Sequence, residues 1–548
     1  MAKFATKPAG VLGTTGEKTS THEGGAGFVR EPKAELYLTA VSTTLEPTFY
    51  ESPSEREDRL RNLVHTVALE DPQWVVNFVR WLRAEANMRS VSLLVAAEFV
   101  KARLDAKATD RTEETVLGAP GLNRQAIAAA ILRADEPGEF IAYWRTRYGR
   151  ALPMPVKRGV ADAARNVFNQ RSALRYDGSG KVMRLGDVVD IVHPIPKGPE
   201  QSALFGWLLD QRHGRRETPG GDISLLKAVS ARGNLNKLPI AERHEFARSV
   251  LAGEPDAEFV WLQALAGQWE WGKSWLGQDA EDKTFTRLSE ADQWKLFVQH
   301  GMGYMAILRN LRNFDEAKID DDVVKHVVAI LGDADEVAKS RQFPFRFFSA
   351  YKATGGGRWA PALSKGVQHS LANVPSLDGN TLLLADMSGS MFGWGGAGHS
   401  KATMAEMAAL FTSALALRAE AATLVQFGTS SKVVPVNRSI GVLDHMAQFG
   451  SMGGTMTMEA IRTHFRKGEH TRVVIVTDEQ AHMDRFGVGI DSLIPEDVHV
   501  FTWNLGGYAP AHVEAGPTRH ALGGLTDSSF RTIPLLETGV EQNWPWEE

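Results

Sequence analysis

The sequence predicts two kinds of structure in one chain: an array of helical repeats, followed by an α/β domain with a doubly wound parallel sheet. Three observations support this prediction. Apolar residues recur at helical spacing from about residue 35 to 355, break signals interrupt that stretch often, and short apolar runs alternate with helical segments after about Arg358. The 548 residues, 43% of them hydrophobic, are enough to build more than one core.

The beginning of the chain carries no pattern of a folded element. The first 30 residues are rich in Gly, Thr and Ala and contain no apolar stretch of signal-peptide length. We therefore expect residues 1–30 to be a disordered N-terminal segment. The longest nearly apolar run, 404–427, is interrupted by Glu406, Arg418 and Glu420, which excludes a membrane span there. These features predict a cytoplasmic protein.

Helical periodicity dominates the next 320 residues or so. Trp74, Phe78, Trp81 and Leu82 share one helical face, for example. Break signals follow at short intervals: Asp71-Pro72, 118–121, 135–138, Pro194, 219–221, Pro239 and 253–255. Segments of this length favour short helices stacked as pairs in an α-solenoid. Because no exact repeat of fixed period is present, an ordinary helical bundle stays open as the alternative.

The C-terminal part alternates strands with helices. Apolar runs predict strands at 381–386, 422–427, 472–477 and 498–503, and helices are predicted at 401–420 and 459–467. Apolar strands that alternate with helices are typical of a parallel sheet covered on both faces.

Three segments of this part predict a metal site. Asp386-Met-Ser388-Gly-Ser390 follows the first strand, Gly453-Gly454-Thr455 precedes a helix, and Asp478 ends a later strand. Ligands collect at the carboxyl ends of strands in such sheets, and hard oxygen ligands suit Mg²⁺ or another divalent cation. The chain has no cysteine, so any metal here is held by oxygen or nitrogen.

Two other interpretations of these segments stay open. The first motif alone also fits a strand-end turn that caps the next helix. A metal-dependent hydrolase is also conceivable, but the only acid–base candidates nearby in sequence are His399 and Glu479, and no motif fixes either beside the metal.

Residues 375–548 resemble the von Willebrand factor A domain with its metal-ion-dependent adhesion site. Asp386, Ser388, Ser390, Thr455 and Asp478 match that motif position by position. The resemblance implies a non-catalytic Mg²⁺ whose open coordination position takes a carboxylate of a partner.

The charge of the chain is unevenly distributed. Residues 141–237 contain 17 Lys and Arg against 8 Asp and Glu, a net charge of +9, so the remainder carries −14 in a chain of net −5. Aromatic residues such as Trp144, Tyr148 and Tyr176 are interleaved with the basic ones. Basic side chains neutralise phosphates and aromatic rings stack on unpaired bases, which predicts RNA binding. The alternative is a solvated face of amphipathic helices.

Three stretches, 147–163, 185–194 and 304–313, are similar to the TROVE module of the Ro autoantigen family. A TROVE module followed by a von Willebrand A domain is the arrangement of that family. The resemblance implies a TROVE domain over residues 31–358, folded as a ring of HEAT-like helical repeats. It also implies that single-stranded RNA ends enter the hole of the ring and that small Y RNAs bind its basic outer surface.

The resemblance and the basic cluster together give a set of candidate RNA-binding residues. His193 matches the RNA-contacting histidine of the family, and a basic pair of the family falls near Arg171, Arg175 and Lys181, although the family's "RNGW" bridge is not reproduced here. Arg309 and Arg312 are expected in the hole, or Arg309 braces adjacent repeats instead. The full set is Lys157, Arg158, Arg171, Arg175, Lys181, Arg184, His193, Arg309 and Arg312.

The sequence thus predicts a monomeric protein subunit of a ribonucleoprotein, without catalytic activity of its own. It would bind a Y-like small RNA and misfolded noncoding RNA, in RNA quality control or stress-related RNA decay. The resemblance also implies an exoribonuclease partner, such as polynucleotide phosphorylase, tethered by the RNA. A Mg²⁺-dependent protein-interaction adaptor without RNA is the alternative.

Overall fold

The computed structural model describes residues 14–20, 26–42, 53–86, 88–108, 120–178, 180–181, 183–214, 222–278, 285–393, 402–478, 492–505, 518–523, 525, 529–538, 544 and 546. The chain forms two compact units. One consists of residues 64–325, and the other combines residues 1–63 with residues 326–548. Among the described residues, no helix is both long and apolar enough to cross a membrane.

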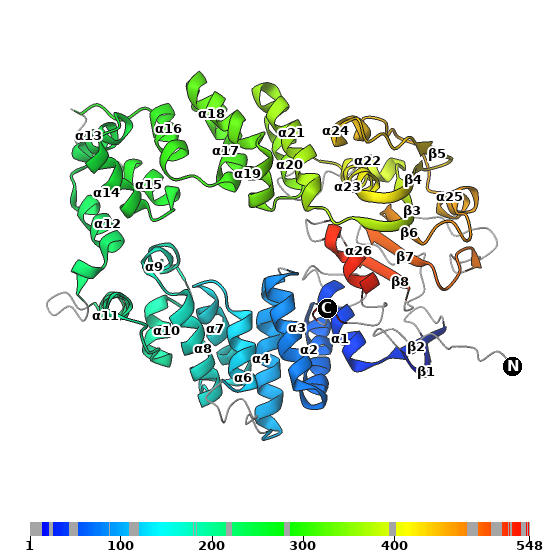
Figure 1. The fold of residues 1–548 in the computed structure, drawn as a ribbon, viewed down its shortest axis with the longest axis horizontal. Coiled ribbons are helices and arrows are strands. Elements are labelled where there is room, and N and C mark those ends of the chain that lie inside the picture. Colours follow the sequence, from blue (N-terminus) through cyan, green and yellow to red (C-terminus); the bar gives the residue numbers. More distant parts are fainter. Residues whose placement is uncertain are drawn as a thin grey trace. The chain divides into compact units, whose positions relative to one another are not determined.

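Residues 64–325 form a helical-repeat unit. Its elements are α3 (Pro72–Ala84), α4 (Arg89–Asp105), α6 (Leu122–Ala130), α7 (Glu136–Tyr148), α8 (Met154–Val167), α9 (Gln170–Tyr176), α10 (Leu185–Val192), α11 (Pro199–His213), η1 (Ile223–Leu225), α12 (Lys227–Lys237), α13 (Ile240–Leu251), α14 (Pro255–Leu265), α15 (Trp269–Leu276), α16 (Glu290–His300) and α17 (Tyr304–Glu316). Two further helices, α2 (Pro53–Glu70) and α18 (Asp321–Leu331), cross its limits. Successive helices pack against one another, α3 on α4, α4 on α6 and α6 on α8 (Figure 1).

The predicted break signals that fall on described residues coincide with helix boundaries, whereas the signal at 219–221 lies outside the described residues. Asp71 caps α3 by accepting a hydrogen bond from the Trp74 amide at 3.1 Å, and Pro72 occupies the first turn, where its missing amide hydrogen costs nothing. Pro255 lies at the start of α14 in the same way. Trp74, Phe78 and Trp81 are buried, as the periodicity predicts.

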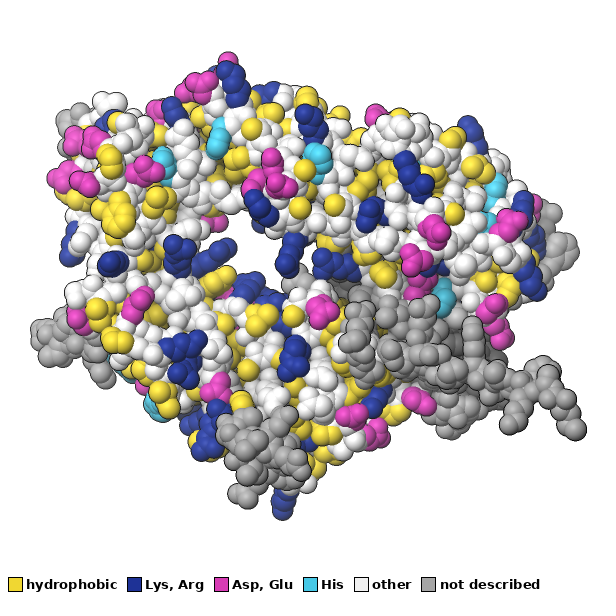
Figure 2. All heavy atoms as spheres, viewed as in Figure 1, with side chains coloured by type: hydrophobic (Ala, Val, Ile, Leu, Met, Phe, Trp, Pro, Cys, Tyr) yellow, Lys and Arg dark blue, Asp and Glu magenta, His cyan; other side chains and the backbone are white. Residues whose placement is uncertain are grey.

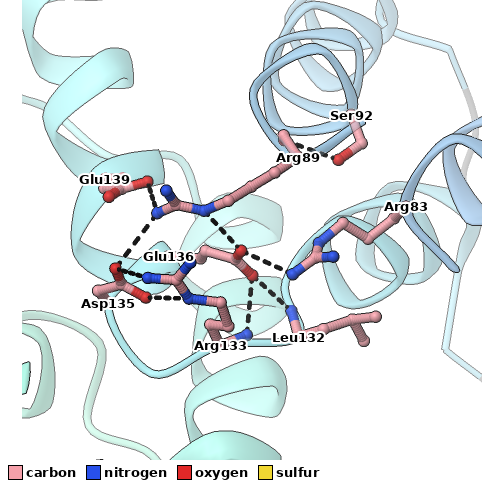
Figure 3. Close-up of polar contacts among 8 residues, drawn as sticks. All are labelled: Arg83, Arg89, Ser92, Leu132, Arg133, Asp135, Glu136 and Glu139. Carbon is pink, nitrogen blue, oxygen red and sulfur yellow. Dashed lines mark hydrogen bonds and ion pairs between the residues drawn. The ribbon is translucent and has the colours of Figure 1, made fainter. Parts of the chain in front are cut away.

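A buried carboxylate joins α3, α4 and α7 (Figure 3). Glu136 is fully buried at the start of α7. One of its oxygens accepts hydrogen bonds from the amides of Leu132 and Arg133 at 2.7 and 2.8 Å, and the other accepts from Arg83 at 2.8 Å and Arg89 at 2.9 Å. Glu136 and Arg83 are both buried, and they are paired with each other inside the helical-repeat unit.

The second unit contains the end of the helical array and the α/β domain. Its helical elements before the sheet are α1 (Pro32–Ser42), α19 (Ala334–Ser340), α20 (Pro344–Thr354), η2 (Gly357–Trp359), α21 (Ala360–Ser370) and η3 (Leu371–Asn373). The α/β domain contains β3 (Leu377–Asp386), α22 (Gly389–Gly393), α23 (Met404–Arg418), β4 (Ala419–Phe427), β5 (Ser431–Val434), α24 (Val442–Met446), α25 (Thr457–His464), β6 (Arg472–Thr477), β7 (His499–Asn504), β8 (Arg519–Gly523) and α26 (Ser529–Thr538).

The sheet has the strand order β5-β4-β3-β6-β7-β8, and only β5 runs antiparallel to its neighbour. The chain moves outward from β3 to β4 and β5 and then returns to place β6 on the other side of β3. The carboxyl ends of β3 and β6 therefore flank the point where the connections diverge, which is where parallel sheets bind ligands.

Both faces of the sheet are covered. On one face, Leu382, Leu384 and Ile475 pack with Ile461 of α25. On the other face, Trp503 of β7 contacts Phe411 of α23, with ring centroids 4.8 Å apart. The four predicted strands and both predicted helices are present, and the fold class of helical repeats plus an α/β domain is confirmed.

The last helices of the array are packed onto the α/β domain inside the second unit. Phe345 of α20 stacks on Phe411 of α23 and contacts Phe530 of α26, with centroid separations of 6.2 and 5.1 Å. Lys352 of α20 also pairs with Glu406 of α23 at 2.7 Å. The limits of the compact units, at residues 63/64 and 325/326, therefore differ from the domain boundaries expected near residues 358 and 375. Those domain boundaries stay a prediction.

The expectation that residues 1–30 are disordered is wrong for part of this segment. Two strands, β1 (Thr14–Ser20) and β2 (Ala26–Arg30), pair with each other in antiparallel orientation. Thr, Phe and Val favour strands, and a pattern this short gives too weak a signal in the sequence. Residues 1–13 lie outside the described part of the chain.

Candidate metal centre and nucleic-acid interface

The five predicted metal ligands come from three loops at one end of the sheet. Asp386 is the last residue of β3, Asp478 directly follows β6, and these strands are hydrogen-bonded neighbours. Asp386, Ser388, Thr455 and Asp478 are buried, and Ser390 is partly buried. The predicted convergence of the motifs is therefore present in the fold.

Backbone hydrogen bonds hold the loops together. The Gly389 amide donates to the Gly453 carbonyl at 2.7 Å, and the Met452 amide donates to the Met387 carbonyl at 2.8 Å. Gly453 has φ +83°, and a Cβ there would meet the Thr429 hydroxyl at 2.7 Å, so only glycine fits. These contacts place the loop of Thr455 beside the loop of Ser388 and Ser390.

The donor oxygens fit a small hard cation. The hydroxyl oxygens of Ser388 and Ser390 are 3.2 Å apart. Neighbouring ligands of an octahedral Mg²⁺, each at 2.0–2.1 Å from the ion, are about 3 Å apart, so the two hydroxyls have the right spacing for one ion. No group of three or more His, Asp or Glu side chains suited to a metal occurs among the described residues, which leaves this mixed carboxylate and hydroxyl set as the candidate.

Asp386 is held in place by two hydrogen bonds and is electrostatically strained. One carboxylate oxygen accepts from the Ser388 amide at 2.8 Å and the other accepts from the Thr477 hydroxyl at 2.6 Å. Burial raises the pKa of Asp386 to about 6, and the charge of Asp478 also raises it. A cation at this place would favour the charged form of Asp386.

Thr477 was not among the predicted residues, although it stands in the same motif as Asp478. Thr477 is a hydroxyl residue at the end of a strand, directly before a predicted metal ligand, and this position is the signal that could have identified it. The acid–base candidates of the hydrolase interpretation, His399 and Glu479, lie outside the described residues.

Basic side chains gather over α8, α9 and α10 of the helical-repeat unit (Figure 2). We use the name basic surface for the exposed or partly exposed residues Lys157, Arg158, Arg165, Arg171, Arg175, Lys181, His193 and Lys197. None of the eight forms an ion pair with an acidic residue of the described part of the chain. The positive charges of the seven Lys and Arg residues among them are therefore available to a ligand.

The structure separates the predicted RNA-binding residues by their pairing. Arg184 pairs with Asp177 at 2.7 Å and its amide donates to Asp187 at 2.9 Å, so it stabilises the start of α10. Arg312 pairs with Glu316 at 3.3 Å on the exposed face of α17. Arg309 is exposed on α17 and has no ion pair with a described residue.

His193 ends α10. Its backbone is left-handed, with φ 49° and ψ 62°, and its amide donates to the Val189 carbonyl at 3.0 Å. The side chain is exposed. His193 thus occupies the end of a helix, as the alternative interpretation expects. Its side chain is also exposed, as contact with RNA requires.

Comparisons with known proteins agree with this architecture. Residues 277–356 match the TROVE domain family. The fold is similar to the crystal structure of the Ro (RSR) protein of Deinococcus radiodurans, with a TM-score of 0.64 and 15% sequence identity over 93% of this chain and 100% of that one. Among curated proteins, none matches this chain in sequence. The family match is confined to residues 277–356, and the structural similarity shows the fold.

Proposed function

We propose that this Ro-type chain is an RNA-binding subunit of a ribonucleoprotein and that the basic surface is where RNA binds. The observation that carries the proposal is the set of eight exposed or partly exposed basic residues that form no ion pair with a described residue, in a chain whose net charge is −5. A structural salt-bridge network would pair such residues, whereas a phosphate-binding surface leaves them for the ligand. The TROVE match and the Ro fold support the same function.

The RNA we propose is a Y-like small noncoding RNA together with misfolded or single-stranded RNA ends. The proposed context is RNA quality control or stress-related decay in the cytoplasm, with an exoribonuclease such as polynucleotide phosphorylase recruited through the RNA. The protein itself would contribute binding and no catalysis. Sequencing of the RNA that crosslinks to the chain in cells tests this, because a small abundant RNA with unpaired loops is expected.

The salt dependence of binding tests the electrostatic part of the proposal. In filter-binding titrations with a structured RNA, the logarithm of the association constant should fall linearly with the logarithm of salt concentration. A slope of roughly −0.7 for each phosphate contact is expected, so about five contacts would give a slope of about −3.5. An affinity that does not change with salt would rule out the basic surface as the main contact.

We propose that Asp386, Ser388, Ser390, Thr455 and Asp478 hold Mg²⁺ or another divalent cation. The ion would supply a positive charge and an open coordination position for a carboxylate. Ser388 and Ser390 would present their hydroxyls to the ion, while the Thr477 hydroxyl keeps Asp386 oriented. The protein-interaction adaptor function is a second candidate, and this site is the observation that favours it.

Metal removal should change stability. At a hundredfold excess over its dissociation constant, Mg²⁺ is expected to stabilise the fold by about 2 to 3 kcal/mol relative to protein with chelator, because the ion binds only the folded state. Thermal unfolding with and without Mg²⁺ measures this. Ser388→Ala should lose the response, whereas Ser439→Ala, at an exposed serine of the same domain, should keep it. An equal response in both variants would place any bound metal elsewhere.

A further inference from the structure

The segment between α10 and α11 carries an apolar side chain at its tip. Ile195 is 77% exposed, which is the largest exposure among the large hydrophobic residues that the structure describes as exposed. Exposed single aliphatic residues are common and need no explanation by themselves. Ile195 differs because of the backbone that presents it and the charges around it.

The backbone around Ile195 is rigid. Pro194 and Pro196 flank it and fix two φ angles, and Pro194 is buried. On the other side, the Lys197 amide donates to the Gln201 side chain at 2.8 Å. Gln201 in turn donates to the carbonyls of Arg165 and Phe168, both at 2.9 Å, which attaches the segment to the end of α8. These restraints limit the backbone conformations of the segment that carries Ile195.

The tip stands within the basic surface. His193 and Lys197 lie two residues to either side of Ile195, and Arg165 is linked to the segment because its carbonyl accepts from Gln201. All three side chains are exposed, and none has an ion pair with a described acidic residue. The two nearby acidic residues are already engaged, because Asp190 lies 3.6 Å from His213 and Glu200 accepts a hydrogen bond from Gln170 at 2.6 Å. An exposed apolar side chain close to the exposed Arg165 and Lys197 fits a ligand that is anionic and also has apolar faces.

We propose that Ile195 contacts an unpaired base of the bound RNA, while Arg165 and Lys197 hold the adjacent phosphates. The inference rests on the proposed RNA binding and deepens it, because it makes unpaired bases the feature that this surface selects. A base in a continuous duplex keeps both faces stacked, but a bulged or single-stranded base exposes them. Aliphatic side chains are known to contact nucleic acid in this way by inserting beside a base.

The test compares two RNAs and two protein variants. The RNAs are a hairpin with one bulged 2-aminopurine and its fully paired counterpart. Ile195→Ser removes the apolar tip without changing charge. Leu262→Ser is the matched control, since Leu262 is 47% exposed on α14, where the first turn carries Asp256 and Glu258. Binding constants and the fluorescence of the 2-aminopurine are measured in the full chain.

For Ile195→Ser we expect about tenfold weaker binding of the bulged RNA, because part of an isoleucine surface is no longer buried against the base. Binding of the paired RNA should change by less than about twofold, since the phosphate contacts remain. The fluorescence change of the bulged base should disappear in this variant and persist in Leu262→Ser.

Two results would overturn the inference while leaving RNA binding intact: equal affinity of Ile195→Ser and wild type for the bulged RNA, or an equal loss for both RNAs. If the wild-type chain binds neither RNA, the proposed function itself fails.

Discussion

Glu136→Ala is expected to destabilise the helical-repeat unit by about 3 to 5 kcal/mol. The substitution leaves Arg83, only 8% exposed, without its carboxylate partner, and it also removes the acceptor for the amides of Leu132 and Arg133. An uncompensated buried charge costs far more than the loss of a surface ion pair, because water cannot replace the missing partner.

Hydrogen exchange measured by mass spectrometry locates the effect of Glu136→Ala. Peptides of α3, α4 and α7 should exchange faster, while peptides of the sheet keep their protection. Glu139→Ala is the control, since Glu139 pairs with the same Arg89 but is 47% exposed, and its removal should cost less than about 1 kcal/mol. Similar protection of α3 and α7 in both variants would show that the buried network contributes little.

The triple variant Arg171→Ala, Lys181→Ala and His193→Ala should weaken RNA binding by roughly tenfold to a hundredfold at physiological salt. All three side chains are exposed on the basic surface and none has an ion pair among the described residues, so their loss removes contacts to RNA rather than contacts within the protein. The magnitude of the salt slope should also fall, by roughly 1.4 if the two permanent charges each hold one phosphate.

The control for the triple variant removes lysines that are already paired. Lys325 and Lys339 are exposed, but they pair with Asp322 and Glu336 at 3.4 and 2.9 Å. The double variant Lys325→Ala and Lys339→Ala should therefore bind RNA nearly as tightly as wild type. If it binds as weakly as the triple variant, overall charge governs binding and the basic surface is not a specific site.

How much of the fold the sequence predicts depends on the strength of each local pattern. β3 and β6 are continuous apolar runs buried on both faces, and the sequence locates them within a few residues. β5 and β8 were not predicted, because Ser431–Val434 and Arg519–Gly523 are short strands at the two edges of the sheet, with too few apolar residues for a periodic signal.

The candidate sites show the same limit. The convergence of the candidate metal ligands was predictable because their spacing follows the strand ends, and the strands bring them together. The ion pairs of the basic residues were not predictable. Arg171 and Arg184 are the same residue type in the same basic stretch, and only the fold shows that Asp177 pairs with Arg184. Ile195 looks like part of a turn in the sequence, since two prolines flank it, and its exposure is a property of the folded segment alone.

The ribosome completes the two compact units of the chain at different times. Tyr37 of α1 contacts Trp544, with ring centroids 5.4 Å apart, so the second unit brings together residues that a ribosome synthesises about 500 positions apart. Residues 64–325 are complete long before that, and domains generally fold as units during synthesis. The basic surface would thus be folded on the nascent chain before the α/β domain is synthesised.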